Sequence, residues 1–529
     1  MPGQMRMSEK HRPSRVLGVV LAAAALVLTA CGTSATSSGD GKIDRDATLR
    51  LTYAGVQSLD PALTPGSTAM LSNTWPVYDR LVQISEDGEY LPMLATKWTF
   101  SEDGKTLRLE LRDDVTFSDG TPFTAETVKA NVERYQSAPV SKAATSVIDS
   151  VDVVDEHTVD LHLAAPSRAV LAALTAAAPG IMISERALDN PDLGTKPVGS
   201  GAWEIDTFRP SEAVTYKRRT DDGGMWDPET GKVARVEIAV RTTPSAYAAI
   251  RSGQVDVVLS NGDVRELQSG IDQGTLKVRP LKNASTTATV HLNQTVKPFD
   301  DVRVRQAVNH AINRKPLVEA LVPTTTPRVQ PMASVVTGFD EALEGIYPYD
   351  PAKAKQLLAE AGYPDGVEAG TFYVANYEPF PEAAQIVQAD LAEVGIKIEL
   401  ELYDIRQLAS GTYGNSDRPG SFMFMSYPGL EPGVDLKWFL ENPLVLPGGV
   451  PEKISQQIAR VDDSTATDEE RAARAKAVVK WATEQALYAP MWQGVPGWVM
   501  TDKVHGVEDG KAFLAPLGGQ DFRHAWMSK

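Results

Sequence analysis

Alternating apolar and polar positions predict several strands with one buried face. In TLRLELR, Leu107, Leu109 and Leu111 alternate with polar and charged side chains, which is the two-residue period of a strand. The stretch VDVVDEHTVDLHL predicts a hairpin that turns near Asp155 and Glu156. The apolar face of such strands needs a second layer of structure to cover it.

Helices are predicted where start and stop signals agree with the apolar spacing. Asp350 and Pro351 supply an N-cap and a first-turn proline for AKAKQLLAEA, and Gly362 ends this helix. Thr467 and Glu470 form a capping box that opens another helix, expected to reach about residue 487. A third helix, about residues 382–394, is followed by the alternating strand IKIELEL. Helices and strands are interspersed along the chain, which favours an α/β architecture.

The first thirty residues have the layout of a secretory signal. Four basic residues precede an uninterrupted apolar run, Val16 to Ala30. A helix of that length spans roughly 22 Å, less than the ~30 Å hydrocarbon core that a permanent membrane span must cross. We therefore expect residues 1–30 to be a removable signal peptide.

Leu28-Thr29-Ala30-Cys31 resembles the bacterial lipobox, in which the cysteine is lipidated and becomes the mature N-terminus. Cys31 is the only cysteine in the chain, and lipidation would remove a thiol that has no partner in an oxidising compartment. The small polar residues 31–46 then predict a flexible tether. An ordinary signal peptide followed by an incidental cysteine is the alternative.

The charge of the mature chain excludes one class of partner. Removing four basic residues and one acidic residue with the signal leaves 48 basic and 68 acidic side chains, a net charge of −20. So acidic a protein is not expected to bind nucleic acid.

About 480 residues follow the tether, too many for one hydrophobic core, so two or three domains are expected. No second apolar stretch is long enough to cross a bilayer.

Motifs of the common catalytic classes are missing from the sequence. There is no G-x-S-x-G elbow, H-E-x-x-H motif, Walker loop or cysteine pair, so we predict no catalytic residues and no cofactor. Acidic side chains are too abundant to identify a glycosidase pair, and an exported hydrolase stays an alternative.

If His157 and His162 both lie on the second strand of the hairpin, they face opposite sides and cannot share a metal. We predict no metal site.

Five blocks, from near Leu51 to near Val507, resemble the extracellular solute-binding proteins of family 5, the oligopeptide, dipeptide and nickel-binding group that serves ATP-driven (ABC) importers. The most specific block is SEDGKTLRLELRDDVTFSDGTPFTAETVKANVER, in which Thr124 is expected to cap a helix. The other blocks are LDP with VYDRLVQISEDGEYLPMLATKW, PVGSGAW, DVRVRQAVNHAINRKPLV, and YDPAKAKQLLAEAGYPDG with its following helix and strand. PVGSGAW departs from the family form, which usually has Thr and Pro where Ser200 and Ala202 stand.

The resemblance implies a two-lobed periplasmic-binding-protein fold of type II, in the large cluster with an extra subdomain. The chain would cross between the lobes near residues 283–295 and return near 487–497. Lobe I would comprise residues 47–285 and 490–529, with the extra subdomain at about 82–196, and lobe II residues 286–489. The lobes would close around a solute and deliver it to the importer's permease subunits.

The resemblance also implies an acid that binds the amino terminus of a peptide, in a loop of the second lobe. The corresponding stretch, SYPGLEPGVDLKWFL, offers Glu431 and Asp435. Either acid can instead be an ordinary surface residue.

Aromatic rings and backbone donors supply the remaining candidates for binding. The aromatic candidates are Trp75, Tyr427 and Trp492, each with burial in a core as the alternative. Gly199 and Ser200 can present backbone donors from the first lobe.

We expect a monomer that is exported, lipid-anchored on the outer face of the cytoplasmic membrane, and engaged in peptide capture. Members of the family also bind oligosaccharides, opines or chelated nickel, or act as sensors without transport. These alternatives stay open.

Overall fold

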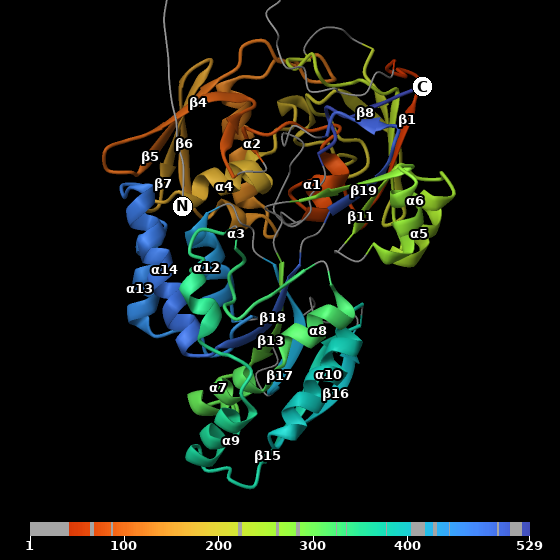
Figure 1. The fold of residues 1–529 in the computed structure, drawn as a ribbon. Coiled ribbons are helices and arrows are strands. Elements are labelled where there is room, and N and C mark those ends of the chain that lie inside the picture. Colours follow the sequence, from red (N-terminus) through yellow and green to blue (C-terminus); the bar gives the residue numbers. More distant parts are fainter. Residues whose placement is uncertain are drawn as a thin grey trace, which may run out of the picture. The chain divides into compact units, whose positions relative to one another are not determined.

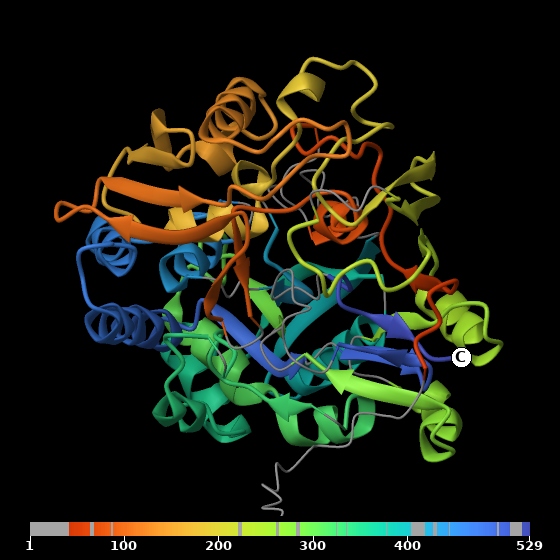
Figure 2. The same cartoon turned by 90° about the horizontal axis from the view of Figure 1, so that it is seen from above.

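The computed structural model describes residues 42–529, except 64–67, 86–87, 221–224, 261–263, 282–285, 324, 335, 377, 404–417, 427–430, 444, 495–496 and 508–520. The described residues belong to one structural unit. Figure 1 shows its helices and strands, and Figure 2 shows them from above. Three larger sheets organise this unit, so the predicted α/β class is confirmed.

The first sheet has seven strands, six from the first 280 residues and one from the C-terminal part of the chain. In spatial order they are β12 (Leu276–Pro280), β19 (Gly497–Thr501), β11 (Val257–Ser260), β1 (Thr48–Thr52), β10 (Arg235–Ala239), β9 (Ala213–Arg218) and β8 (Trp203–Arg209). Helices α1 (Thr68–Thr74), α5 (Thr243–Arg251) and α6 (Gln268–Asp272) belong to this part of the chain. We call residues 42–281 and 497–529 the first lobe.

The second sheet has six strands, all from the middle of the chain. In spatial order they are β14 (Thr326–Pro327), β18 (Tyr488–Gly494), β13 (Thr286–Leu292), β17 (Gly420–Ser426), β15 (Val367–Ala375) and β16 (Ile396–Tyr403). Its helices are α7 (Val302–Ala311), α8 (Arg314–Leu321), α9 (Pro351–Glu360) and α10 (Phe380–Glu393). We call residues 286–494 the second lobe. Strand β18 continues to Gly494, beyond the expected lobe boundary at residue 490.

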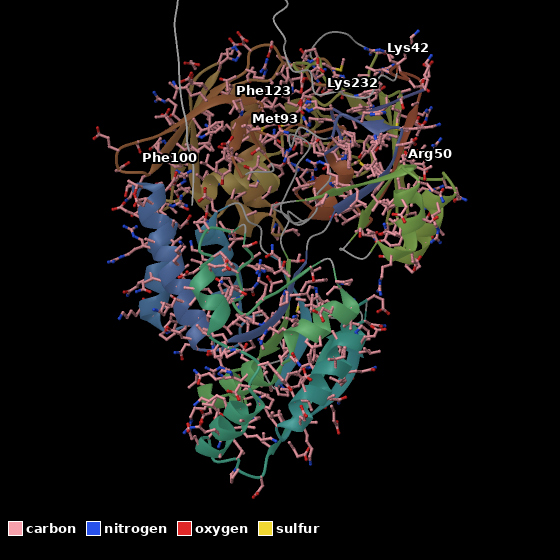
Figure 3. The ribbon with its side chains drawn as sticks, viewed as in Figure 1. Lys42, Arg50, Met93, Phe100, Phe123 and Lys232 are labelled. Carbon is pink, nitrogen blue, oxygen red and sulfur yellow. The ribbon has the colours of Figure 1, made fainter. Side chains whose placement is uncertain are left out.

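A four-stranded antiparallel sheet forms a subdomain within the first lobe. Its spatial order is β4 (Ala95–Phe100), β5 (Thr106–Leu111), β7 (Thr158–Leu163) and β6 (Ile148–Asp155). Helices α2 (Ala125–Ser137), α3 (Lys142–Thr145) and α4 (Ala169–Ala176) and the hairpin β2 (Val82–Ile84) and β3 (Tyr90–Pro92) accompany it. The leucines of β5 are buried in its core, as their alternation predicts, and Figure 3 labels Met93 and Phe123 in the same region.

Three helices of the second lobe form a separate layer beside the subdomain (Figure 1). They are α12 (Pro432–Leu440), α13 (Glu452–Val461) and α14 (Asp468–Glu484). Their apolar faces meet in a hydrophobic cluster with residues near 332–343 and 487–488. This layer extends the second lobe toward the subdomain.

The beginning and end of the described chain lie together at the first lobe. Ile43 forms an isolated bridge with Ser528, and the backbone N–H of Lys529 donates to the Lys42 carbonyl oxygen at 3.2 Å. Strand β21 (Trp526–Met527) pairs with β20 (Val504–His505) nearby. Lys42 is labelled at this edge in Figure 3. Residues 42–46, expected to end the tether, therefore belong to the folded unit.

Candidate functional site

The first sheet presents the carboxyl ends of its parallel strands to the place where the chain changes lobes. Strand β19 begins just after the return crossing, and its first residue, Gly497, pairs with Ser260, the last residue of β11. Strand β1 runs parallel to β11 and to β10. The ends of β1, β10 and β11 therefore lie at the crossing edge.

The second sheet also has the carboxyl ends of its parallel strands at the edge where the chain changes lobes. Strand β13 begins just after the first crossing, and Thr286 pairs with Ser426, the last residue of β17. Strand β15 is parallel to both β17 and β16. In open α/β sheets, ligands bind outside the carboxyl ends of the strands. The candidate site is accordingly the space between these two sheet edges.

The aromatic candidates Trp75 and Trp492 lie in hydrophobic cores. Trp75 packs edge-on against Trp203, with ring centroids 5.5 Å apart, in the core of the first lobe. Trp492 lies on β18 among Phe380 and Phe424 in the core of the second lobe. Each of the two tryptophans is almost completely buried in this structure.

The glycine-containing loop is packed against the segment after α1. A Cβ on Gly199 would lie 1.9 Å from the Val77 carbonyl oxygen, so no larger residue fits there. The Gly199 carbonyl accepts a hydrogen bond from the Ser118 N–H at 2.9 Å. Ser200 is buried, and its hydroxyl donates to Asp79 at 2.9 Å. The loop therefore joins the first sheet to the subdomain.

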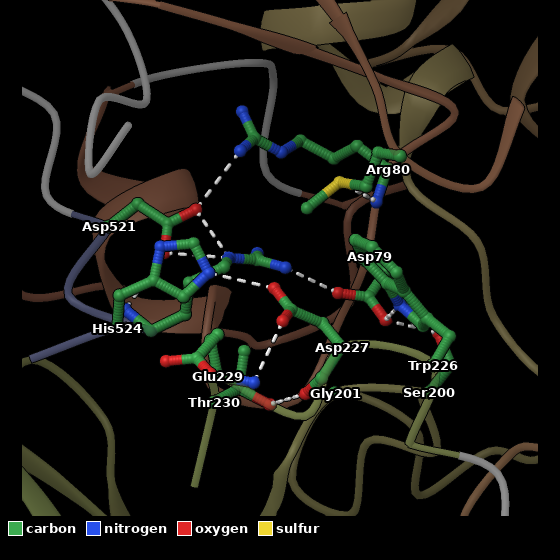
Figure 4. Close-up of polar contacts among 12 residues, drawn as sticks. Asp79, Arg80, Ser200, Gly201, Trp226, Asp227, Glu229, Thr230, Asp521 and His524 are labelled. Atoms are coloured by element: carbon green, nitrogen blue, oxygen red, sulfur yellow. Dashed lines mark hydrogen bonds and ion pairs between the residues drawn. The ribbon is translucent and has the colours of Figure 1, made fainter. Parts of the chain in front are cut away.

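Ser200 belongs to a buried charged network that Figure 4 shows. Asp79 accepts hydrogen bonds from Arg523 Nη1 at 2.6 Å and from Trp226 Nε1 at 2.9 Å. Arg523 also binds Asp521, which accepts from Arg80 Nη2 at 3.1 Å. Beside it, His524 Nε2 lies 2.7 Å from Asp227. The network thus pairs two basic side chains, Arg80 and Arg523, with two acidic ones, Asp79 and Asp521.

Burial and pairing act in opposite directions on the two arginines. Burial lowers the pKa of Arg80 to about 10, because desolvation disfavours its charge. The pKa of Arg523 is raised: burial lowers it, but Asp521 and Asp79 outweigh that effect. Both guanidinium groups are charged at neutral pH. Removing one partner from such a network leaves a buried charge unpaired, at a cost of roughly 3–5 kcal/mol.

Glu431, a candidate for the amine-binding acid, is buried just before α12 and is surrounded by cations and a phenol. Its carboxylate pairs with Arg471 of α14 in the same lobe. From the first lobe, Tyr90 donates to it at 3.0 Å and Arg168 Nε lies 3.4 Å away. Burial and the adjacent Glu431 raise the pKa of Tyr90, which keeps its hydroxyl protonated. Glu431 thus joins the two lobes in this arrangement.

Asp435, the second acid candidate, is fully buried in the first turn of α12. Its backbone N–H donates to the Glu431 carbonyl at 3.1 Å, so the two acids lie one turn apart. Tyr427 and Cys31 lie outside the described residues.

Sequence reasoning missed Asp462, which lies after α13 and contacts the first lobe. Its carboxylate accepts from the Ser167 hydroxyl at 2.6 Å and from the Ala169 N–H at 3.0 Å. Both donors stand at the start of α4. Its only sequence signal is an Asp-Asp pair after a helix, which is common on protein surfaces.

The described residues contain no cluster of three or more histidine, cysteine or acidic side chains that could hold a metal ion. His157 lies in the hairpin turn, because β7 begins at Thr158. His162 is on β7, with Nε2 2.9 Å from Asp152. The condition that both histidines lie on the second strand is therefore not met. No helix in the described part is both long and apolar enough to span a bilayer.

Solved structures of other proteins share this fold. DppA of Helicobacter pylori, an ABC transporter-associated periplasmic binding protein solved with the peptide STSA, matches with a TM-score of 0.76 and 22% identity, covering 92% of this chain and 98% of that one. NikA of Brucella suis, solved with Fe(III)-EDTA, has the same TM-score and identity, covering 92% and 100%. The chain therefore has the periplasmic-binding-protein fold.

Residues 89–427, well over half of the chain, match the profile of the bacterial extracellular solute-binding proteins, family 5 Middle. The glutathione-binding protein GsiB of Salmonella typhi is 31% identical over 358 residues, which cover 64% of this chain and 66% of that protein. That match spans just under two thirds of the relative's length. The chain belongs to the bacterial extracellular solute-binding proteins of family 5, as its sequence blocks imply.

Proposed function

We propose that this protein captures a peptide between its two lobes and delivers it to the permease subunits of an ABC importer. The observation that carries the proposal is strand polarity: in both sheets the carboxyl ends of the parallel strands lie at the edge where the chain passes from one sheet to the other. A solute that touches both lobes stabilises their closed arrangement, which the importer can recognise.

A peptide is favoured as the solute by the relatives. One curated relative is a glutathione-binding protein, and one structural neighbour was solved with a peptide. A peptide offers backbone donors and acceptors together with charged ends. Asp435 and Tyr427 are proposed to contact it, and Glu431 is proposed to serve both the solute and the lobe contact. Trp75, Trp492, Gly199 and Ser200 are proposed to act indirectly, as supports of the two sheets.

The solute class is tested by native mass spectrometry of the purified protein with a mixed panel. The panel holds glutathione, dipeptides, tripeptides, a nickel–histidine complex, an opine and an oligosaccharide. We expect one peptide bound per chain, because each lobe contributes one sheet edge to a single candidate site. Affinity for that peptide should fall at least about tenfold in Asp435→Asn, the loss expected for one charge-assisted hydrogen bond. Preferential binding of a non-peptide member of the panel would overturn the peptide assignment.

The lipid anchor is proposed from Cys31 and its preceding apolar run. Acylation of that cysteine would hold the monomer at the outer face of the membrane, near the importer, and raise its local concentration. Cys31→Ser should move the protein from the membrane fraction to the soluble exported fraction, measured by fractionation and intact mass. Retention of Cys31→Ser in the membrane fraction would rule out this anchor.

A further inference from the structure

Nearly all packing in the described part of the chain is internal to one lobe. Each buried hydrophobic cluster draws its residues from only one lobe. No pair of described helices or strands packs extensively across the lobes. A boundary without a shared apolar core can open at low cost, and the polar contacts across it determine its stability.

The hydrogen bonds that join described residues of the two lobes gather in one patch, between the subdomain and the layer α12–α14. We call this set the inter-lobe patch. Its residues are Tyr90, Gly104, Ser167, Arg168 and Ala169 of the first lobe and Glu431, Asp462, Ser464 and Asp468 of the second. The patch is built from segments more than 260 residues apart in the sequence.

Asp462 is the centre of the inter-lobe patch. It is 4% exposed, and its two carboxylate oxygens accept from Ser167 and from the first N–H of α4. Its carbonyl oxygen also accepts from the Arg168 N–H at 2.9 Å. An acid at a helix N-terminus satisfies free N–H groups and interacts favourably with the helix dipole. Here the second lobe supplies that capping acid to a helix of the first.

The rest of the patch has complementary charge. Arg168 of the first lobe lies 3.4 Å from Glu431 and 3.5 Å from Asp468. The Ser464 hydroxyl donates to the Gly104 carbonyl at 3.1 Å, and a Cβ on Gly104 would lie 2.5 Å from that hydroxyl oxygen. Such close approach requires the glycine, which stands in a turn at φ +67°.

We propose that Asp462, with Ser167 and the start of α4, is a positioning contact that holds the lobes closed and thereby sets how long a solute stays bound. This inference rests on the proposed function, since it concerns release from the cleft. The contact forms only when the lobes meet, so it acts on the closed state and leaves the encounter with solute unchanged. Asp462 is a positioning residue because it acts through lobe closure.

The test compares Asp462→Asn and Ser167→Ala with the matched control Asp463→Asn. Asp463 is also an aspartate and is adjacent, but among the described residues its carboxylate accepts hydrogen bonds from Thr465, which belongs to its own lobe. The panel peptide that binds the unmodified protein is the probe, and its dissociation rate is measured by stopped flow. We expect about tenfold faster dissociation in Asp462→Asn, about threefold in Ser167→Ala, and no change in the control.

The effects of the two changes should not add in the double variant, because the hydrogen bond that Ser167→Ala removes is one of the two that Asp462→Asn weakens. A merely structural role would lower the unfolding midpoint and leave the dissociation rate of the folded protein unchanged. Dissociation rates equal to that of the unmodified protein in Asp462→Asn and Ser167→Ala would overturn the inference. If Asp462→Asn does not fold, Ser167→Ala decides by the same criterion.

A solute-free readout separates this inference from the proposed function. Hydrogen exchange of residues 167–171 should be faster in Asp462→Asn than in Asp463→Asn, because the Ala169 N–H then has a weaker, uncharged acceptor in place of the carboxylate. If no panel member binds even the unmodified protein, the proposed solute class fails while this exchange still tests the contact. Equal exchange in the two variants would overturn the contact itself.

Discussion

At the scale of single residues, burial separates candidates that the sequence cannot separate. A tryptophan that stacks on a solute and one that fills a core have the same sequence signal. Trp75 and Trp492 lie in hydrophobic clusters, where Trp75 contacts the Trp203 ring and Trp492 contacts the Phe380 ring. The sequence places Ser200 in a glycine-containing loop, but its hydrogen bond to Asp79 joins residues that are 121 positions apart in the chain. Residue types predict what chemistry is possible, and the fold decides what each side chain contacts.

His291 provides a pH-dependent prediction at this scale. Burial lowers its pKa to about 4, and its ring lies edge-on to Tyr488 with centroids 5.1 Å apart. Between pH 6.5 and 4 the unfolded chain binds a proton here that the folded chain does not, so stability falls as pH falls. From pH 6.5 to 5 the loss should be about 2 kcal/mol.

His291→Phe keeps a ring of similar size and removes the titration. Its free energy of unfolding in urea should therefore decrease less than that of the unmodified protein between pH 6.5 and 5, by about 2 kcal/mol. An identical pH dependence in the two proteins would contradict the assignment of a buried neutral imidazole.

At the scale of elements, the sequence predicts helix starts well, because the capping chemistry is local. Asp350 caps α9 through the Lys353 N–H, and Thr124 caps α2, both as expected. The hairpin of β6 and β7 also turns where predicted. The helix expected to reach about residue 487 ends at Glu484, because Ala486 adopts a left-handed backbone conformation, with φ +48°, that no glycine or proline announces in the sequence. Contacts such as Asp462 with α4 could not be predicted, because no local pattern marks a cap supplied from a distant segment.

The capping box of α14 gives a prediction at the same scale. Thr467 Oγ1 accepts from the Glu470 N–H at 3.2 Å, and the Glu470 carboxylate accepts from the Thr467 N–H at 3.0 Å. Thr467→Ala should lower the free energy of unfolding by about 1 kcal/mol, because one N–H at the helix start loses its acceptor. Urea denaturation measures this, and Thr467→Ser is the control, expected within about 0.5 kcal/mol of the unmodified protein. A loss equally large in Thr467→Ser would contradict a capping role.

At the scale of the whole molecule, two lobe crossings, family membership and a polar inter-lobe patch support one account. The sequence blocks imply two lobes. In the described residues, β12 of the first sheet ends at Pro280 and β13 of the second begins at Thr286, and β18 of the second sheet ends at Gly494 before β19 of the first begins at Gly497. The identity of the solute cannot be predicted in the same way, because specificity depends on side chains of the cleft rather than on the family's scaffold blocks. The net charge of −20 describes the protein surface as a whole and does not identify the solute.

The central claim is that the lobes close around a bound peptide, and small-angle X-ray scattering tests it most directly. The radius of gyration of the mature protein is measured without solute and with a saturating amount of the panel peptide that binds. The account predicts a decrease on peptide addition, and a smaller change in Asp462→Asn at the same occupancy because its closed state is less favoured. A radius of gyration that stays unchanged while the peptide is bound would contradict the account.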